Sequence, residues 1–264
     1  MSKLAVQMYT VREHTRTLMD LAQSLEKIRR IGYRAVQMSA VGAMDGETPE
    51  VSAKAARKML DDNGLRCIAT HRSWDKLSTQ TDVEIDFHRI LGCDFTAIGS
   101  LPQSYTSDSA AGYRRFLKDA EPLVRRLKEA GIRFGVHNHD HEFQRVGPGR
   151  KTLFDILIDE GGAELMLEVD VYWVNHAGAD PAGVLTRCTG RAPVIHVKDK
   201  EVIPSLGPVM APIGEGNLDW DRILPAGCDA GVEWYAVEQD EYRRDPFDCL
   251  NASYRYLSDR EAAL

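Results

Sequence analysis

Hydrophobic and polar positions along the chain repeat with a period of roughly 30 to 40 residues, about the size of one strand–helix unit. Seven times, a stretch with apolar residues at steps of three and four ends close to a glycine. A short run rich in β-branched and apolar residues then follows. Glycine suits the position just past a helix end because it adopts left-handed backbone conformations at little cost. The seven glycines are Gly32, Gly64, Gly92, Gly131, Gly162, Gly190 and Gly231.

This pattern predicts eight strands, one at the start of the chain and one after each glycine. They cover residues 4–9, 34–39, 65–71, 94–99, 133–139, 165–171, 193–198 and 234–239. Helices are expected at 18–31, 49–63, 83–91 and 113–130. Asp180, followed by Pro181, and Asp219 are expected to begin two more helices, the second running through Leu224. Eight strands alternating with helices in 264 residues predict a single (β/α)₈ TIM barrel that comprises residues 1–264.

A doubly wound sheet is the alternative fold for such an alternation of strands and helices. That fold usually carries a glycine-rich phosphate-binding turn directly after its first strand. Here residues 9–13 read Tyr-Thr-Val-Arg-Glu and contain no glycine. The sequence therefore favours the barrel.

Composition and charge restrict the classes of function. The net charge of −7 disfavours a nucleic-acid binder, which needs basic surface to displace counterions from phosphates. The five cysteines form no Cys-x-x-Cys pair, so neither a disulfide framework nor a zinc knuckle is predicted. The N-terminal residues contain no apolar signal segment, and no stretch reaches membrane-spanning length. We therefore expect a cytoplasmic protein without a nucleic-acid or membrane partner.

Acidic residues and one histidine follow four successive predicted strands, at the end of the barrel where active sites lie. They are Glu142, Asp170, His196 and Glu238. Taken singly, an aspartate or a histidine in such a place is more often a helix cap or a satisfied polar group. Three carboxylates and an imidazole would resist being enclosed together unless a cation neutralised them. We therefore predict that these four residues hold one divalent metal ion, Mn²⁺, Mg²⁺, Co²⁺ or Zn²⁺.

Other polar and aromatic residues near the strand ends are candidates for supporting and substrate-binding roles. Glu168 shares the parity of Asp170 and is expected beneath the metal, as a hydrogen-bonded partner and not a ligand. Trp74 and Trp173 can stack on a sugar face, with core packing as the alternative. The remaining candidates are Gln7, Arg12, His71, His137, His139 and Lys198.

Several motifs resemble those of the xylose isomerase-like sugar phosphate isomerase/epimerase family, and the resemblance covers nearly the whole chain. They are VQMYTVR at 6–12, HNHDHEF at 137–143, LEVDVYW at 167–173, HVKD at 196–199, GEG at 214–216 and VEQD at 237–240. The family consists of TIM barrels with one catalytic metal held by Glu, Asp, His and Glu, which implies the same four residues here. In its ketose epimerases the two glutamates also act as acid and base. Because strand five ends here in His-Asn-His, His139 or His137 is an alternative base.

The resulting hypothesis is a metal-dependent sugar isomerase or epimerase that abstracts a proton next to the carbonyl of a keto- or aldo-sugar. Glu142, Glu238 or a strand-five histidine would be the base, and Lys198 would stabilise developing negative charge. The expected partner is a small-molecule sugar, no nicotinamide or flavin is required, and a homo-oligomer is compatible with the sequence. One alternative is a metal-dependent lyase or dehydratase acting on a 3-keto-glycoside or a keto-inositol. The other is a catalytically silent barrel that binds a sugar or a partner protein.

Endonuclease IV, a DNA repair enzyme, also resembles this family. It requires a cluster of zinc ions and additional histidines after strands six and seven. In this chain those places read Asp-Val-Tyr-Trp at 170–173 and Asp-Lys-Glu at 199–201. The extra histidines are missing and the net charge is negative, so a nuclease is not predicted.

Overall fold

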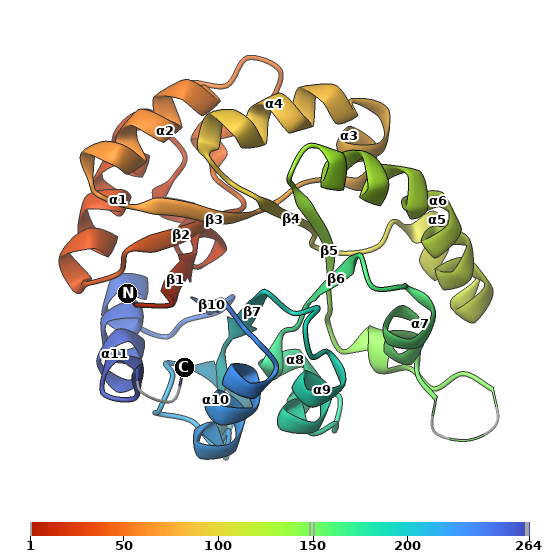
Figure 1. The fold of residues 1–264 in the computed structure, drawn as a ribbon. Coiled ribbons are helices and arrows are strands. Elements are labelled where there is room, and N and C mark those ends of the chain that lie inside the picture. Colours follow the sequence, from red (N-terminus) through yellow and green to blue (C-terminus); the bar gives the residue numbers. More distant parts are fainter. Residues whose placement is uncertain (1, 148, 150, 262–263) are drawn as a thin grey trace.

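Eight parallel strands form one sheet in the order β6-β5-β4-β3-β2-β1-β10-β7. The computed structural model describes residues 2–147, 149, 151–261 and 264. Figure 1 shows these strands as a ring with the helices outside it. The strands of the ring are β1 (Leu4–Gln7), β2 (Ala35–Met38), β3 (Arg66–His71), β4 (Phe95–Ile98), β5 (Arg133–His137), β6 (Leu165–Glu168), β7 (Val194–Val197) and β10 (Trp234–Val237).

The ring closes between β6 and β7, directly at the carboxyl end of the barrel. Asp170 and His196 form an isolated parallel bridge there. The backbone N–H of His196 donates a hydrogen bond of 2.9 Å to the carbonyl oxygen of Val169. The predicted (β/α)₈ barrel is confirmed, and each predicted strand contains an observed strand that ends one to three residues earlier at its carboxyl end or at the same residue.

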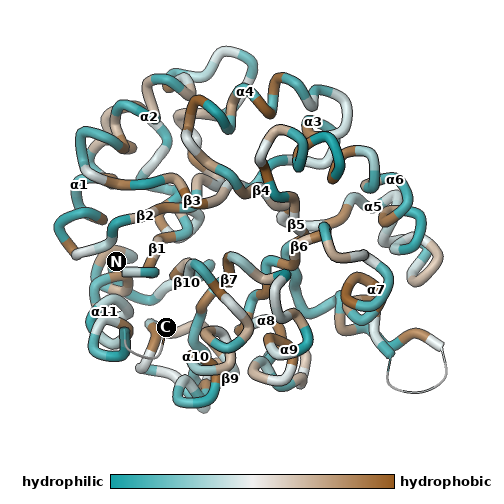
Figure 2. The backbone as a smooth tube through the Cα atoms, viewed as in Figure 1, coloured by the Kyte–Doolittle hydropathy of each residue, from teal (hydrophilic) through white to brown (hydrophobic). Residues whose placement is uncertain are grey.

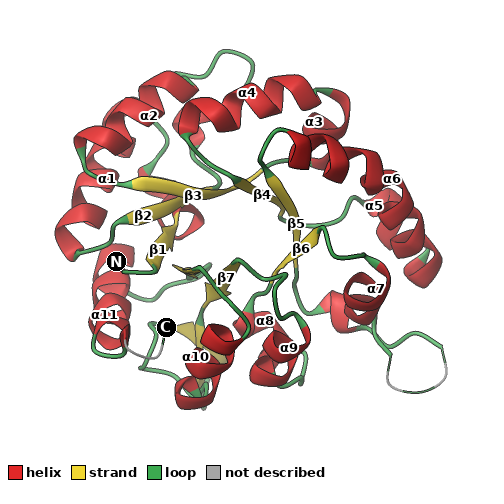
Figure 3. Cartoon of the chain, in the orientation of Figure 1, coloured by secondary structure: helices red, strands yellow, loops and turns green. Residues whose placement is uncertain are grey.

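The helices cover the outside of the ring (Figure 3), and in the described part of the chain none of them is both long and apolar enough to span a membrane. Asp219 begins its helix as predicted, since its side chain accepts a hydrogen bond from the backbone N–H of Arg222. The helices are α1 (Leu18–Ile31), α2 (Ala53–Asp62), α3 (Trp74–Thr79), α4 (Thr81–Leu91), α5 (Gln103–Thr106), α6 (Ser109–Glu129), α7 (Leu153–Glu160), α8 (Val171–His176), α9 (Pro181–Arg187), α10 (Trp220–Asp229) and α11 (Pro246–Ser258). Short 3₁₀ helices are η1 (Met8–His14), η2 (Gly42–Met44) and η3 (His141–Phe143).

The seven glycines of the sequence repeat all have positive φ angles, from +62° at Gly64 to +131° at Gly32. Gly32 ends α1 and also faces a close neighbour. A Cβ atom at this position would lie 2.4 Å from Cζ of Tyr254 on α11. This glycine therefore serves both the backbone conformation and the approach of the last helix to the first.

Small apolar side chains fill the inside of the barrel below its mouth. Alanines from five strands take part, together with Phe95 and Met166. Gly135 on β5 leaves room for the ring, because a Cβ there would lie 2.9 Å from Cζ of Phe95. A larger cluster joins the outer faces of the strands to the helices, and Figure 2 shows hydrophobic positions recurring in both. The interior of the barrel is therefore a packed apolar core, and the polar side chains at the strand ends lie above it.

A two-stranded antiparallel hairpin, β8 (Asp199–Ile203) and β9 (Gly207–Ala211), follows β7 and was not predicted. The fully buried carboxylate of Asp199 ties the hairpin to the segment before α10. It accepts hydrogen bonds from the backbone N–H groups of Lys200 (2.8 Å), Gly214 (2.9 Å), Gly216 (3.2 Å) and Leu218 (3.1 Å), and from the indole of Trp220 (2.7 Å). A Cβ atom on Gly216 would lie 2.3 Å from Oδ1 of Asp199, which explains a glycine of the GEG motif.

Replacing Asp199 by Asn should lower the free energy of unfolding by about 3 kcal/mol, because an amide NH₂ group would face buried N–H donors that now share a carboxylate. Asp219→Asn is the matched control. This exposed residue caps α10, and asparagine caps helices as well as aspartate does, so the change should stay within about 0.5 kcal/mol. Urea unfolding measures both. Equal, small effects would show that Asp199 does not organise this segment.

Candidate functional site

A cavity of about 560 Å³ opens over the carboxyl ends of the strands, and we call it the reaction chamber. Arg12 does not line it. Its guanidinium donates hydrogen bonds of 2.9 Å to the carbonyl oxygens of Tyr9 and Asp240 and so supports the chamber wall. The predicted site residues that do line the chamber are Gln7, His71, His137, His139, Trp173, Lys198 and Glu238.

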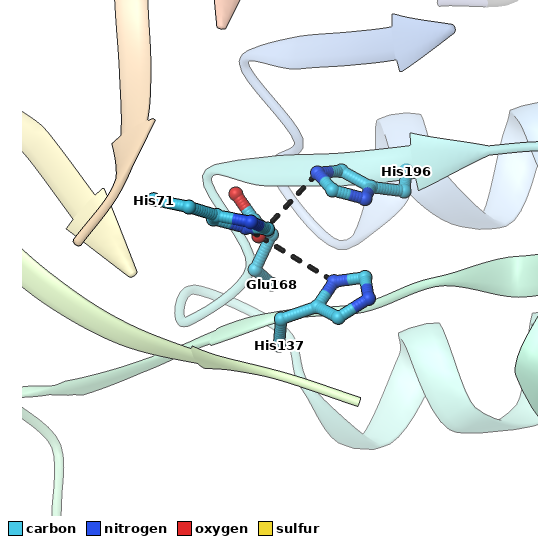
Figure 4. Close-up of side chains that lie close together, drawn as sticks. All are labelled: His71, His137, Glu168 and His196. Carbon is cyan, nitrogen blue, oxygen red and sulfur yellow. Dashed lines mark hydrogen bonds and ion pairs between the residues drawn. The ribbon is translucent and has the colours of Figure 1, made fainter. Parts of the chain in front are cut away.

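The buried carboxylate of Glu168 lies beneath this chamber among imidazoles from three other strands (Figure 4). Its Oε2 accepts a short hydrogen bond from Nε2 of His71 and lies 3.3 Å from Nε2 of His196 and 3.5 Å from Nδ1 of His137. Its Oε1 accepts a hydrogen bond of 2.9 Å from the amide of Gln37. Burial alone would raise the pKa of Glu168, but the charges of His196 and His71 outweigh it and hold the pKa well below its usual range. The expectation of a hydrogen-bonded carboxylate below the candidate metal ligands matches this arrangement.

Gln37 determines which nitrogen of His196 carries a proton. The ionised Glu168 only accepts hydrogen bonds, so the NH₂ group of Gln37 must face it. The amide oxygen of Gln37 then faces Nε2 of His196 at 2.9 Å, and this nitrogen must donate. His196 is therefore anchored through Nε2 and directs Nδ1 toward Asp170 and Glu238. A ring nitrogen held by a hydrogen bond opposite the free one is the arrangement that metal-binding histidines usually adopt.

Three of the four predicted metal ligands lie together. Oδ2 of Asp170 and Oε2 of Glu238 lie 3.8 Å and 2.8 Å from Nδ1 of His196, and all three residues are buried. None of these three atoms has a hydrogen-bond partner in the described structure. Their close contacts are ion pairs with one another and with Lys198, and buried carboxylate and imidazole atoms that make no hydrogen bonds fit a divalent cation.

Lys198 lies beside the same oxygens. Its ammonium group donates hydrogen bonds of 3.0 Å to both oxygens of Asp240. It lies 3.0 Å from Oδ2 of Asp170 and 2.8 Å from Oε2 of Glu238, ion pairs that lack hydrogen-bond geometry. Burial disfavours the ammonium ion, but the three carboxylates raise its pKa above the usual range. Burial, followed by the charge of Glu238, raises the pKa of Asp240 to about 6. Lys198 therefore remains a cation within an acidic site.

The same contacts keep two of the candidate ligands, His196 and Glu238, in their charged forms. Burial would lower the pKa of His196, but Glu168 and Glu238 raise it to about 10. Burial would raise the pKa of Glu238, but Lys198 and His196 hold it well below its usual range. Without a metal, His196 is thus an imidazolium paired with Glu238. Binding of a metal at Nδ1 must displace that proton.

Glu142, the fourth predicted ligand, does not lie with the other three. Its buried carboxylate accepts a hydrogen bond of 2.8 Å from the backbone N–H of His139 and one of 3.3 Å from the hydroxyl of Tyr113. It also lies 2.9 Å from Nε2 of His141. The physical reason is the turn after β5, where η3 folds Glu142 back onto its own loop and against α6. The sequence did not show this, because the three residues between His139 and Glu142 make a turn and not a further strand position.

The two histidines at the end of β5 are neutral groups of the chamber. Burial, together with repulsion from His196, lowers the pKa of His137 well below its usual range, and burial also lowers that of His139. Nε2 of His137 lies 3.8 Å from Oδ2 of Asp170. Nδ1 of His139 is buried without a hydrogen-bond partner. His139, whose pKa is lowered less strongly than that of His137, is the better placed of the two to accept a proton near neutral pH.

Gln37 and Asp240 make specific contacts in this site but were not assigned a role from the sequence. Gln37 follows the inward parity of β2, and Asp240 lies two residues after Glu238. Both positions are polar strand ends, which is the signal that was available. Their roles depend on contacts with Glu168 and Lys198, and those contacts require the closed ring.

Comparisons with known proteins agree with this architecture. The structure is similar to that of a sugar phosphate isomerase/epimerase from Parabacteroides distasonis, with 22% sequence identity and a TM-score of 0.81. The match covers 97% of this chain and 93% of that chain. An L-ribulose 3-epimerase is 15% identical with a TM-score of 0.71, and the match covers 100% of this chain and 96% of the epimerase. The IOLI protein, solved with a zinc atom bound, is 14% identical with a TM-score of 0.68, and the match covers 98% of each chain. No match was found among curated protein sequences.

The decisive comparison is with a family profile. The profile of the xylose isomerase-like TIM barrel matches residues 25–246, well over half of the chain. The matched region runs from α1 to the start of α11 and includes the candidate ligands and the strands that carry them. The chain therefore belongs to the xylose isomerase-like TIM-barrel family.

Proposed function

We propose that this protein is a divalent-metal-dependent sugar isomerase or epimerase that removes and returns a proton next to a carbonyl group. The observation that carries the proposal is the set of three orphaned, buried atoms on Asp170, His196 and Glu238. Carboxylate and imidazole ligands suit Mn²⁺, Mg²⁺, Co²⁺ or Zn²⁺. The sugar-processing names of the structural relatives and the bound zinc of one of them support the same class of chemistry.

A cation at this place would supply Lewis acidity, polarising the substrate carbonyl and increasing the acidity of the neighbouring C–H group. Glu238 is the first candidate base, because it lines the chamber and Lys198 and His196 keep it ionised. Lys198 offers a fixed positive charge to the oxygen on which negative charge develops. His139 lines the same chamber as a neutral imidazole and is the second proton carrier.

Glu142 enters the proposal as a positioning residue. Its carboxylate holds the backbone N–H of His139 at 2.8 Å and fixes the turn that presents this imidazole to the chamber. The substrate is a small sugar held by polar groups such as Gln7 and by the indole of Trp173. Catalysis by proton transfer needs neither nicotinamide nor flavin.

A lyase or dehydratase is the second candidate function. The orphaned Nδ1 of His139 favours it, because this imidazole can take up the proton removed from the substrate and then, as an imidazolium, deliver it to a departing oxygen. The same enolate chemistry then ends in expulsion of a β-substituent instead of reprotonation. The two outcomes share the metal and the base and differ in the product.

Purified protein should bind close to one divalent ion per chain, and Asp170→Asn should weaken Mn²⁺ binding by at least about 10²-fold, because it removes an anionic ligand. Glu142→Gln is the matched control and should leave Mn²⁺ affinity within about threefold, since its carboxylate already holds three partners elsewhere. Calorimetric titration with Mn²⁺ measures both. Loss of the metal in Glu142→Gln with retention in Asp170→Asn would contradict this ligand assignment.

Glu238→Gln should lower turnover by at least about 10²-fold, because the variant loses both a ligand and an ionised base. The assay is deuterium uptake at the α-carbon in D₂O, followed by NMR with a panel of keto-sugars and without added nicotinamide. Metal content is measured on the same sample. A fully metallated Glu238→Gln protein with near-normal exchange would remove Glu238 from the role of base and leave His139 in its place.

The product distinguishes the two candidate functions. An isomerase or epimerase should return a product of unchanged mass in H₂O, since the proton removed is replaced. A lyase or dehydratase should release water or an aglycone and leave an unsaturated sugar. Mass spectrometry of the products measures this difference. If every accepted substrate loses mass, the protein is a lyase or dehydratase and not an isomerase or epimerase.

A further inference from the structure

A cavity of about 450 Å³ lies on the outside of the barrel, between α6 and the segment that joins α7 to β6, and we call it the side groove. It exists because two neighbouring helices (Figure 1) differ in length: α6 has 21 residues and α7 has 8. Glu160, the last residue of α7, pairs with Arg114 on the second turn of α6. Most of α6 therefore continues beside residues 161–164 and not beside a helix.

The side of α6 that faces the side groove carries a second apolar stripe. It consists of Leu117, Ala120 and Val124, at steps of three and four, and Leu165 completes an aliphatic floor. The first stripe of α6 packs on the barrel and includes Tyr113, Phe116, Leu123 and Leu127. A helix on the surface of one domain needs a single apolar stripe, so a second stripe indicates packing against a further surface.

The opposite wall of the side groove is built from small residues. Gly161, Gly162 and Ala163 stand there, and Gly162 has a φ angle of +72°. A Cβ atom on Gly161 would lie 2.4 Å from the carbonyl oxygen of Leu157 and 2.8 Å from Cδ2 of Leu165. The segment therefore returns to β6 without bulky side chains. This leaves room over the aliphatic floor for the side chains of another helix.

Ion pairs frame both ends of the side groove. At one end Arg114 of α6 lies 2.8 Å from Glu160, which also pairs with Lys151 at 3.3 Å. At the other end Lys128 of α6 lies 2.6 Å from Glu164. The basic side chains of both frames thus come from α6, and the acidic ones lie across the groove. All of them are partly or largely exposed, so each pair contributes little to stability and can exchange partners.

This surface is complementary to itself under a twofold rotation. Leu117 and Val124 are placed symmetrically about the point between Ala120 and Glu121, and so are the two basic ends of the groove. An axis through that point makes a second α6 run antiparallel to the first. Leu117 of one copy then lies level with Val124 of the other. Ala120 lies at the crossing, where a small side chain lets two helices approach closely.

The charges agree with the same rotation. Lys128 of one copy comes level with Glu160 of the other, and Arg114 comes level with Glu164, so opposite charges meet at both ends. Glu121 approaches its own copy near the axis, but the guanidinium of Arg125 lies 3.2 Å from its carboxylate and offsets the repulsion.

The side groove carries both signs of charge in nearly equal number, so the acidic excess of the chain is not concentrated on this face. A mixed rim does not select a small anion or cation, whereas a rotated copy matches it.

We propose that the side groove is an interface between two copies of this chain, in which α6 packs antiparallel against α6 of the second copy. Among the described residues, none lines both the side groove and the reaction chamber, so both chambers of the dimer stay open. The inference is independent of the proposed function, because it uses no residue of the candidate metal site.

Sedimentation equilibrium of the full chain, from about 1 to 300 µM, should show a reversible monomer–dimer equilibrium with a Kd below about 100 µM. A chain that stays monomeric over this range would overturn the inference. Native mass spectrometry of the same sample identifies any other occupant. A monomer that carries a bound amphiphile would assign the side groove to that ligand and overturn the inference too.

Charge reversal at the exposed Lys128 tests the face without touching the core. Lys128→Glu should raise the Kd of the dimer at least about tenfold, since it places two acidic groups together at each end of the interface. Arg126→Glu is the matched control and should change the Kd by less than about twofold. It breaks an equally exposed ion pair, with Asp82, on the side of α6 that faces α4.

A charge in the apolar stripe tests the floor of the groove. Val124→Asp should also raise the Kd at least about tenfold, whereas Val83→Asp, at a 63% exposed position on α4, should leave it within about twofold. Circular dichroism confirms that each variant is folded. A dimer that survives Lys128→Glu, or survives Val124→Asp in a folded protein, would show that another face joins the two copies and would overturn the inference.

Discussion

The buried carboxylate of Glu168 determines how the mouth of this barrel is built. An ionised group at the centre of a protein is stable only when hydrogen bonds and opposite charges replace its water. Glu168 meets this requirement through Gln37, His71, His137 and His196, which come from β2, β3, β5 and β7. One carboxylate thus gathers side chains from four strands. His71 is anchored on it by a hydrogen bond and His196 by an ion pair, while His137 only lies nearby.

The consequences reach the candidate metal ligands. With Nε2 of His196 held by Gln37, its Nδ1 faces Asp170 and Glu238. Asp170 and His196 also form the bridge that closes the ring between β6 and β7, so barrel closure and site geometry depend on the same pair. Lys198 partly offsets the negative charge that this convergence creates. The ligand oxygens nevertheless stay without hydrogen bonds, which is the property that a cation would satisfy.

The sequence predicts the barrel well because its signals are local and repeated. The apolar runs that follow the seven glycines give seven strands, and the opening run of the chain gives the eighth. Alternation along β6 and β7 places Glu168, Asp170, His196 and Lys198 on the inside. Glu142 lies elsewhere because its position depends on the turn of η3, which strand parity does not describe. The β8–β9 hairpin depends on the buried carboxylate of Asp199, whose partners lie up to 21 residues away. Contacts of that range require the folded chain.

Anomalous diffraction near the manganese absorption edge, from a crystal of the protein soaked in Mn²⁺, would locate the metal. We expect a single strong anomalous peak among Oδ2 of Asp170, Nδ1 of His196 and Oε2 of Glu238, with the ammonium of Lys198 still paired to Asp240. A peak between His139, His141 and Glu142, where a second group of candidate ligands lies, would contradict it. So would the absence of any peak at the barrel mouth at saturating Mn²⁺.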